Sequence, residues 1–189
     1  MKKFLVVGTL FIIAVAALTA ILSTRKESRQ ASTMSQLKLT SPVFEENGTI
    51  PSKYTCDGED INPPLEISGI PADAKSLALI MDDPDAPRGI WDHWVVFNIR
   101  PTTDDQQQKS YRILEGVEPE GIAGNNSWPK KGYGGPCPPS GTHRYFFKLY
   151  ALDVMLDLPA GSSKGEVESA MRGHILDQIE LVGLYARGR

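Results

Sequence analysis

The sequence predicts a mainly β protein, and three observations lead to this fold class. Short apolar runs rich in β-branched and aromatic residues occur at 76–83, 94–100 and 144–153, and each has the length of a buried strand. Turn dipeptides and prolines crowd residues 41–76, which leaves no room there for a helix. Helical spacing of apolar residues is clear in one place, close to the C-terminal end. We therefore expect about seven strands and one well-defined helix.

The first 22 residues have the pattern of a targeting element. Lys2 and Lys3 precede an uncharged stretch, Phe4–Leu22, and basic residues follow it. A helix over this stretch measures about 30 Å, which matches the hydrocarbon layer and favours an uncleaved signal anchor. Small residues at 14–16 and 19–20 also permit cleavage as a signal peptide. We expect a single-pass cell-membrane protein with an exported domain, or a periplasmic or secreted domain after cleavage.

Residues 23–36 are polar and lack a hydrophobic period, so we expect a linker there and one domain over residues 37–189. The chain has a formal net charge of −3, but its first thirty residues carry +4, so the remainder carries −7. An acidic domain argues against a nucleic-acid partner and against broad adhesion to anionic lipids. Contact with a membrane is expected through the N-terminal segment only.

The last part of the domain changes character. Ser162 and Ser163 are suitable N-caps, and Val167, Ala170 and Met171 follow them at helical spacing, which predicts a helix. Alternation over residues 179–187 then predicts a final strand.

Unusual polar residues stand at one end of each central strand. Asp82, Asp83 and Asp85 stand at the end of the first strand, His93 precedes the second, and His143 precedes the third. If the strands are neighbours, these side chains meet at one rim of the sheet. The segment Asp83-Pro84-Asp85 is also well suited to a simple turn, and a histidine beside tryptophans is often a core residue, so a purely structural role remains open.

Strand alternation predicts which face each histidine occupies. His93 should share a face with Val95 and Phe97, and His143 one with Tyr145 and Phe147. Imidazoles that donate and carboxylates that accept, gathered in one small hollow, suit a zwitterionic or phosphorylated ligand.

The long loop at 116–143 is rich in glycine and proline, and a loop of this length inside a compact domain is usually functional. Gly134 and Gly135 permit a close backbone approach or a positive φ, while the nearby prolines stiffen the chain. The loop therefore predicts a rigid wall with exposed amides. It lacks the glycine patterns of nucleotide-binding loops.

The two cysteines, Cys56 and Cys137, leave two readings open. In an oxidising compartment they can pair, and closing so long a loop stabilises by about 4 kcal/mol. Because neither lies in a CxxC motif, we favour two small buried hydrophobic residues.

Four segments follow one another along the chain: YTCDGEDINPPL (54–65), DDPDAP (82–87), DHWVVFNI (92–99) and YGGPCPPSGTHRYFFKLYAL (133–152). Taken together they resemble the phosphatidylethanolamine-binding protein (PEBP) family, in particular its bacterial Raf-kinase-inhibitor-like branch. The resemblance covers roughly residues 37–187. It implies a large antiparallel sheet packed on a smaller one with a few peripheral helices, preceded here by the N-terminal hydrophobic helix.

The resemblance also implies an anion-binding pocket that needs no cofactor and no metal. The residues that match the pocket of the family are Asp83, Asp85, Trp91, His93, Gly135, Pro136, Pro138, His143 and Tyr145. Animal members close this pocket with a C-terminal helix. Here the last predicted strand ends close to Arg189, so we expect an open pocket, and the short stretch 88–90 predicts few contacts beyond the histidine rim.

Three functions follow as hypotheses. The favoured one is a non-enzymatic binding protein that takes a small anionic or phosphorylated ligand and regulates a protein partner. The second is an inhibitor of a protease or another enzyme, which acts through a protruding loop; the family contains such inhibitors. The third is a weak hydrolase, in which Cys137 works with a histidine or two His and two Asp hold a metal. The sequence lacks the HExxH motif of zinc hydrolases.

Overall fold

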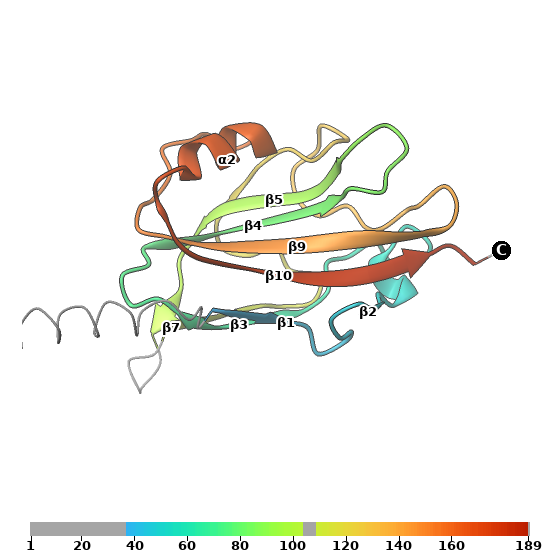
Figure 1. The fold of residues 1–189 in the computed structure, drawn as a ribbon, viewed down its shortest axis with the longest axis horizontal. Helices are drawn as coiled ribbons and strands as arrows, with labels where there is room; N and C mark the ends of the chain where they lie inside the picture. Colours follow the sequence, from blue (N-terminus) through green and yellow to red (C-terminus); the bar gives the residue numbers. More distant parts are fainter. Residues whose placement is uncertain (1–36, 104–108, 189) are drawn as a thin grey trace, which may run out of the picture. The chain divides into compact units, whose positions relative to one another are not determined.

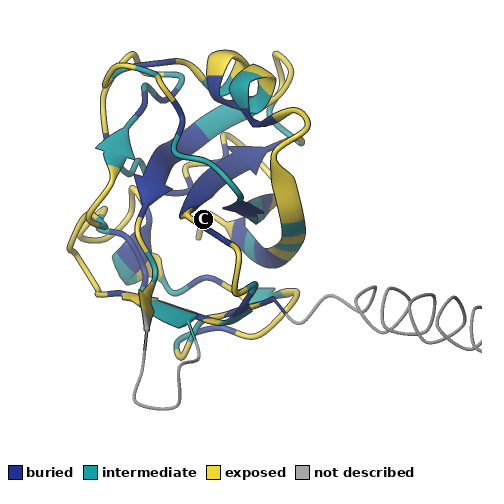
Figure 2. Cartoon of the chain, turned by 90° about the vertical axis from the view of Figure 1, so that its left-hand side faces the viewer, coloured by how far each residue is buried: buried dark blue, intermediate teal, exposed yellow. Residues whose placement is uncertain are grey.

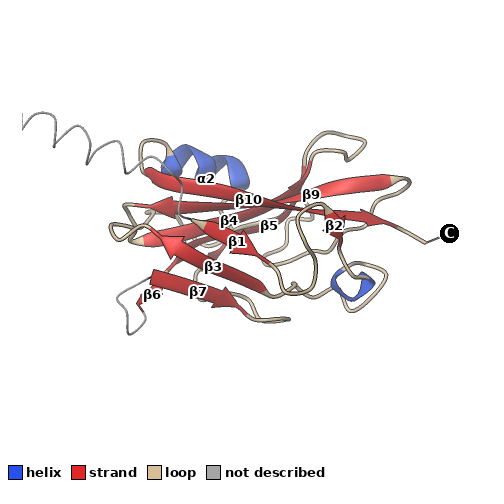
Figure 3. Ribbon diagram, turned by 60° about the horizontal axis from the view of Figure 1, so that its bottom comes forward, coloured by secondary structure: helices blue, strands red, loops and turns tan. Residues whose placement is uncertain are grey.

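The computed structural model describes residues 37–103 and 109–188, and these form two β-sheets that pack face to face (Figures 1 and 3). The predicted signal segment, 1–22, and linker, 23–36, lie outside the described residues. Among the residues that are described, no helix is both long and apolar enough to cross a membrane.

The larger sheet has six strands in the order β2-β10-β9-β4-β5-β8. Neighbouring strands in this sheet run antiparallel, except for β2 and β10, which run parallel. Its strands are β2 (Gly48–Thr49), β4 (Ser76–Asp83), β5 (Trp91–Ile99), β8 (Ile122–Ala123), β9 (Thr142–Leu152) and β10 (Ile175–Ala186).

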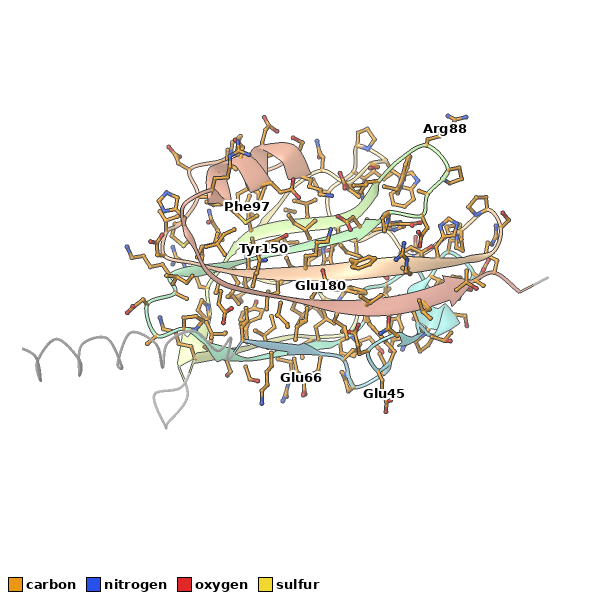
Figure 4. The ribbon with its side chains drawn as sticks, viewed as in Figure 1. Glu45, Glu66, Arg88, Phe97, Tyr150 and Glu180 are labelled. Atoms are coloured by element: carbon orange, nitrogen blue, oxygen red, sulfur yellow. A yellow bond between two sulfur atoms is a disulfide. The ribbon has the colours of Figure 1, made fainter. Side chains whose placement is uncertain are left out.

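The smaller sheet has four strands in the order β1-β3-β7-β6, all antiparallel. Its strands are β1 (Lys38–Thr40), β3 (Leu65–Ile70), β6 (Thr102–Thr103) and β7 (Lys109–Ile113). On the outer side of this sheet, Glu66 points into solvent (Figure 4). The predicted mainly β class and the pairing of a large with a small sheet are confirmed.

Two apolar layers explain why the central strands are so hydrophobic. Leu77, Leu79 and Met81 of β4 pack in the core between the sheets, whereas Ala78 and Ile80 pack in a second core on the opposite face. All eight residues of β4 are buried, as Figure 2 shows for the centre of the large sheet. A strand buried on both faces loses its polar alternation, which is why this segment is a continuous apolar run.

Helix α2 (Lys164–Met171) covers that second core (Figure 1). Ser163 caps it, since the Ser163 hydroxyl accepts from the backbone N–H of Glu166 and the Glu166 carboxylate accepts from the N–H of Ser163. The expectation of a few peripheral helices is corrected: within the described residues, one α-helix accompanies a single 3₁₀ turn, η2 (Ser52–Tyr54).

The cysteines correct a second expectation. Cys56 and Cys137 form a disulfide, with Cα atoms 5.4 Å apart, and both residues are exposed rather than buried in a core. The bond ties the chain just after η2 to the long loop before β9. Sequence spacing alone did not predict this pairing, because the separation of 81 residues says nothing of how the fold brings the two segments together.

Candidate functional site

A hollow of about 380 Å³ lies where β4 ends, β5 begins and β9 begins. The size falls within the range of small-ligand sites. Its lining consists of Asp83, Ala86, Pro87, Arg88, Trp91, His93, Trp128, Cys137, Pro139 and His143. Four residues predicted for the site, Asp83, Trp91, His93 and His143, are among them.

A β-bulge in β5 brings His93 into this hollow. Met81 of β4 pairs with Trp94, and the next residue, Asp82, pairs with Asp92, so His93 has no partner opposite it. An extra residue shifts the alternation of a strand, and the ring of His93 therefore contacts Tyr145 of the inter-sheet core, with centroids 5.2 Å apart. The predicted face for His93, that of Val95 and Phe97, is wrong for this reason.

His143 and Asp83 form a buried pair. The Nδ1–H of His143 donates to Oδ2 of Asp83 at 2.7 Å, and both side chains are less than a tenth exposed. The predicted face for His143 is correct, since its ring lies parallel to that of Tyr145. Because a carboxylate can only accept, the pair fixes the tautomer of the imidazole and leaves Nε2 of His143 for other partners.

His93 is held in the same way by the backbone of the long loop. Its Nδ1–H donates to the carbonyl of Gly134 at 2.7 Å, and the N–H of Gly134 donates to the carbonyl of His93 at 3.0 Å. Burial lowers the pKa of His93, against the smaller effect of nearby carbonyls and carboxylates. Burial therefore favours the neutral form of His93, in which Nε2 carries the free lone pair.

Two further polar atoms in this region have no hydrogen-bond partner among the described residues. The Nε1–H of Trp91 and the hydroxyl of Tyr145 are both buried. Tyr145 does not line the hollow but lies behind the two imidazoles. Burial raises the pKa of Tyr145, so its hydroxyl stays protonated. A buried donor without a partner is costly, and a ligand acceptor in the hollow would satisfy the N–H of Trp91, which lines it.

Asp85 does not line the hollow, contrary to expectation. Its carboxylate accepts from the backbone N–H of Arg144 at 3.0 Å and from the guanidinium at 2.9 and 2.7 Å, and this contact lowers the pKa of Asp85 to about 2. Its own N–H donates to Oδ1 of Asp83 at 2.8 Å. Asp85 therefore orients the turn that presents Asp83.

Gly135, Pro136 and Pro138 are also absent from the lining, and all three are buried. A Cβ on Gly135 would lie 2.5 Å from Oδ1 of Asp60 and 2.6 Å from the carbonyl of Tyr54. The close approach that this glycine permits is thus between two protein segments, not between the backbone and a ligand. These residues brace the wall from behind, while Cys137 and Pro139 face the hollow.

Sequence reasoning missed Arg88 and Trp128. Arg88 stands at the tip of the β4–β5 loop (Figure 4), so the stretch 88–90 does contribute to the rim. The ring of Trp128 packs edge-on against those of Trp91 and His93, with centroids 5.3 and 5.1 Å away. A lone arginine between two polar motifs and a tryptophan inside a glycine-rich loop were the available signals.

The arrangements expected for a hydrolase, a free Cys137 thiol or a metal site, are not found among the described residues. Cys137 is bonded to Cys56, so it offers no thiolate in this oxidised form. Across the described ranges, no three His, Cys, Asp or Glu side chains are grouped in a way that would hold a metal ion.

The fold and the hollow define a class: a two-sheet β protein with a small-ligand hollow at the ends of its central strands. The family model for phosphatidylethanolamine-binding protein matches residues 40–186, so the chain belongs to the PEBP family, a family of binding proteins.

Relatives and solved structures agree with this assignment. The UPF0098 protein of Methanothermobacter thermautotrophicus is 53% identical over 155 residues, which cover 80% of this chain and all of the relative. A UPF0098 protein of Archaeoglobus fulgidus is 44% identical over 182 residues, 96% of this chain but 60% of that relative.

Two crystal structures share the fold. The first, a putative PEBP homologue from Chlamydia trachomatis, has a TM-score of 0.75 and 40% identity, covering 82% of this chain and all of its own. The second, E. coli YbcL, described as a new member of the mammalian PEBP family, has a TM-score of 0.72 and 27% identity, covering 81% of this chain and 99% of its own.

Proposed function

We propose that this chain is a non-enzymatic binding protein whose hollow takes a small anion or a phosphorylated headgroup. One observation carries the proposal: the Nδ1 atoms of His93 and His143 are both tied to protein acceptors, Gly134 and Asp83. Each imidazole is thus fixed with its Nε2 available to a ligand. Such an Nε2 accepts from a ligand O–H or N–H, and the Nε2 of a protonated His93 donates to a phosphate oxygen.

The charges around the hollow support an anionic ligand. Both oxygens of Asp83 already accept hydrogen bonds, from His143 and from the N–H of Asp85, so its charge is partly offset. Arg88 at the rim makes no ion pair with any described carboxylate. Together with the N–H of Trp91, Arg88 offers donors where an anion would enter.

The name of the family supports the phosphorylated-headgroup class, since phosphatidylethanolamine carries a phosphodiester and an amine. A carboxylate, Asp83, beside an arginine, Arg88, suits such a zwitterion, and Arg88 with a protonated His93 suits inorganic phosphate as well. The exposed disulfide supports an oxidising compartment, in line with the proposed export of the domain behind an anchor or a cleaved signal.

Amide NMR of the full-length protein tests the proposal. Phosphoethanolamine and inorganic phosphate are titrated separately, with choline chloride as a control that has no phosphate. We expect shifts at Asp83, His93, Gly134 and His143 with both phosphate compounds and not with choline. Larger shifts with phosphoethanolamine than with phosphate identify the headgroup as the ligand class. Unchanged amides at millimolar concentration of both compounds would refute the proposal.

A further inference from the structure

A second hollow, of about 320 Å³, lies beside the first. Trp128 and Cys137 line both, so one indole ring and the disulfide form the partition between them. Beyond this partition the second hollow is lined by Asn126, Lys130 and Lys131 among others. No residue of this hollow except Gly135 was predicted for the site.

The partition is fixed in place by packing. A Cβ on Gly134 would lie 2.7 Å from the Trp128 ring, so glycine at this position lets the indole lie close against the backbone. The same ring is packed edge-on against Trp91 and His93 of the first hollow. A ligand that leaves the imidazoles therefore reaches the second hollow by crossing a single aromatic ring.

A buried asparagine builds the turn that carries the two lysines. Oδ1 of Asn126 accepts from the N–H of Trp128 at 3.0 Å and from that of Lys130 at 3.1 Å. Its Nδ2 donates to the carbonyl of Gly132 at 3.2 Å. With these three hydrogen bonds, Asn126 positions both the partition and the cations that follow it.

These lysines carry uncompensated charge in an otherwise acidic domain. Within residues 37–103 and 109–188, neither Lys130 nor Lys131 pairs with a carboxylate. The carboxylate that lines this hollow, Asp60, accepts from the N–H of Gly135 at 2.7 Å. Two adjacent like charges repel, and an anion between them relieves that repulsion.

We propose that the second hollow is a subsite for a second anionic group of the same ligand. The ligand class is then a molecule with two phosphate or similar groups joined by a short linker, which lies on Trp128. This inference rests on the proposed function for the first anionic group. The lysine subsite adds affinity because the second contact is made within an already bound molecule.

Calorimetric titration of the full-length protein at low ionic strength tests the subsite. The probes are alkane α,ω-bisphosphonates with two to eight methylenes, compared with butylphosphonate. We expect one spacer length to bind about tenfold or more tightly than the monophosphonate. K130Q/K131Q should lose this gain and bind the monophosphonate as the wild type does. K38Q/K75Q, which removes the same charge from two exposed lysines elsewhere, should keep it.

The outcomes separate the two proposals. If butylphosphonate binds but no bisphosphonate binds more tightly, or if K130Q/K131Q keeps the gain, the subsite is refuted and the first hollow stands. If butylphosphonate fails to bind, the proposed function fails and the two-group ligand fails with it. A water-soluble short-chain phosphatidylinositol 4-phosphate gives the last arm. Its binding, lost in K130Q/K131Q, identifies a lipid headgroup, whereas binding of bisphosphonates alone identifies a free molecule.

Discussion

Removing the disulfide is the sharpest test of how the wall of the hollow is held. The change is C56S/C137S, and the bond closes a loop with a sequence separation of 81. On the chain-entropy model, a cross-link that closes a loop of this length lowers the entropy of the unfolded chain by about 15 cal/mol/K. The variant should therefore lose about 4.5 kcal/mol of stability at 25 °C. For a guanidinium slope of about 4 kcal/mol/M, the unfolding midpoint falls by about 1 M.

Ligand affinity should respond very differently. Without the disulfide, two hydrogen bonds still hold the long loop. The N–H of Cys56 donates to the carbonyl of Pro136 at 3.2 Å, and the hydroxyl of Tyr133 donates to the carbonyl of Tyr54 at 2.7 Å. The N–H of Gly135 on Asp60 adds a third tether. We therefore expect the affinity for phosphoethanolamine to change less than about threefold, because changes at the surface usually alter free energies by about 0.5 kcal/mol or less.

Guanidinium unfolding followed by tryptophan fluorescence, with calorimetric binding at 25 °C, measures both quantities. Wild-type protein reduced with a dithiol serves as the matched control and should unfold as C56S/C137S does. A stability loss below about 1 kcal/mol would show that the bond does not act through loop closure. A collapse of affinity with a small loss of stability would show that it shapes the hollow directly.

Three further predictions concern charged groups. Burial lowers the pKa of His93, and a bound anion raises it again, so anion binding takes up a proton and the affinity should increase as pH falls toward and below 6.5. Calorimetric titration in buffers of different ionisation enthalpy measures this proton uptake. An H93Q variant that kept the same pH dependence would contradict the assignment to His93. Lys164 lies 2.5 Å from the buried carboxylate of Asp82, so K164M should lower the free energy of unfolding, measured by chemical denaturation, by about 2 kcal/mol. This is less than the loss for a buried charge with no partner, because Lys148 still pairs with Asp82. An unchanged free energy of unfolding would show that the pair is dispensable. The folded-state pKa of Asp85 is about 2, below its unfolded value of about 3.9, so its contact with Arg144 stabilises above pH 4 and is lost as pH falls toward 2. Because that pair is partly exposed, D85N should remove about 1 kcal/mol or less of stability at pH 7 and flatten the acid side of the stability curve; an unaltered acid profile would refute this role.

The long loop gives the site its specific form. Gly134 ties it to His93, Cys137 ties it to the segment after η2, and Asn126 closes the turn that carries Trp128. None of these contacts belongs to regular secondary structure. They explain why a loop so rich in glycine and proline is one continuous wall.

Several features follow from local sequence. The apolar run of β4, the cap at Ser163 and the strand that begins near His143 depend on short-range chemistry, and the structure confirms each of them. Chain position alone also placed Asp83, His93 and His143 at one rim, because antiparallel neighbours bring their ends together.

The remaining features required the tertiary structure. The face of His93 depends on a bulge opposite Met81 and Asp82, which appears only when β4 and β5 are in register. The direction of the Asp85 side chain depends on Arg144, which lies far away in the sequence on the neighbouring strand β9. The bond between Cys56 and Cys137 depends on where two loops meet. Residue types and periodicity thus determined the fold class and the end of the sheet that bears the site. Register and loop packing decided which side chains face the hollow, because these are long-range pairings that no local pattern encodes.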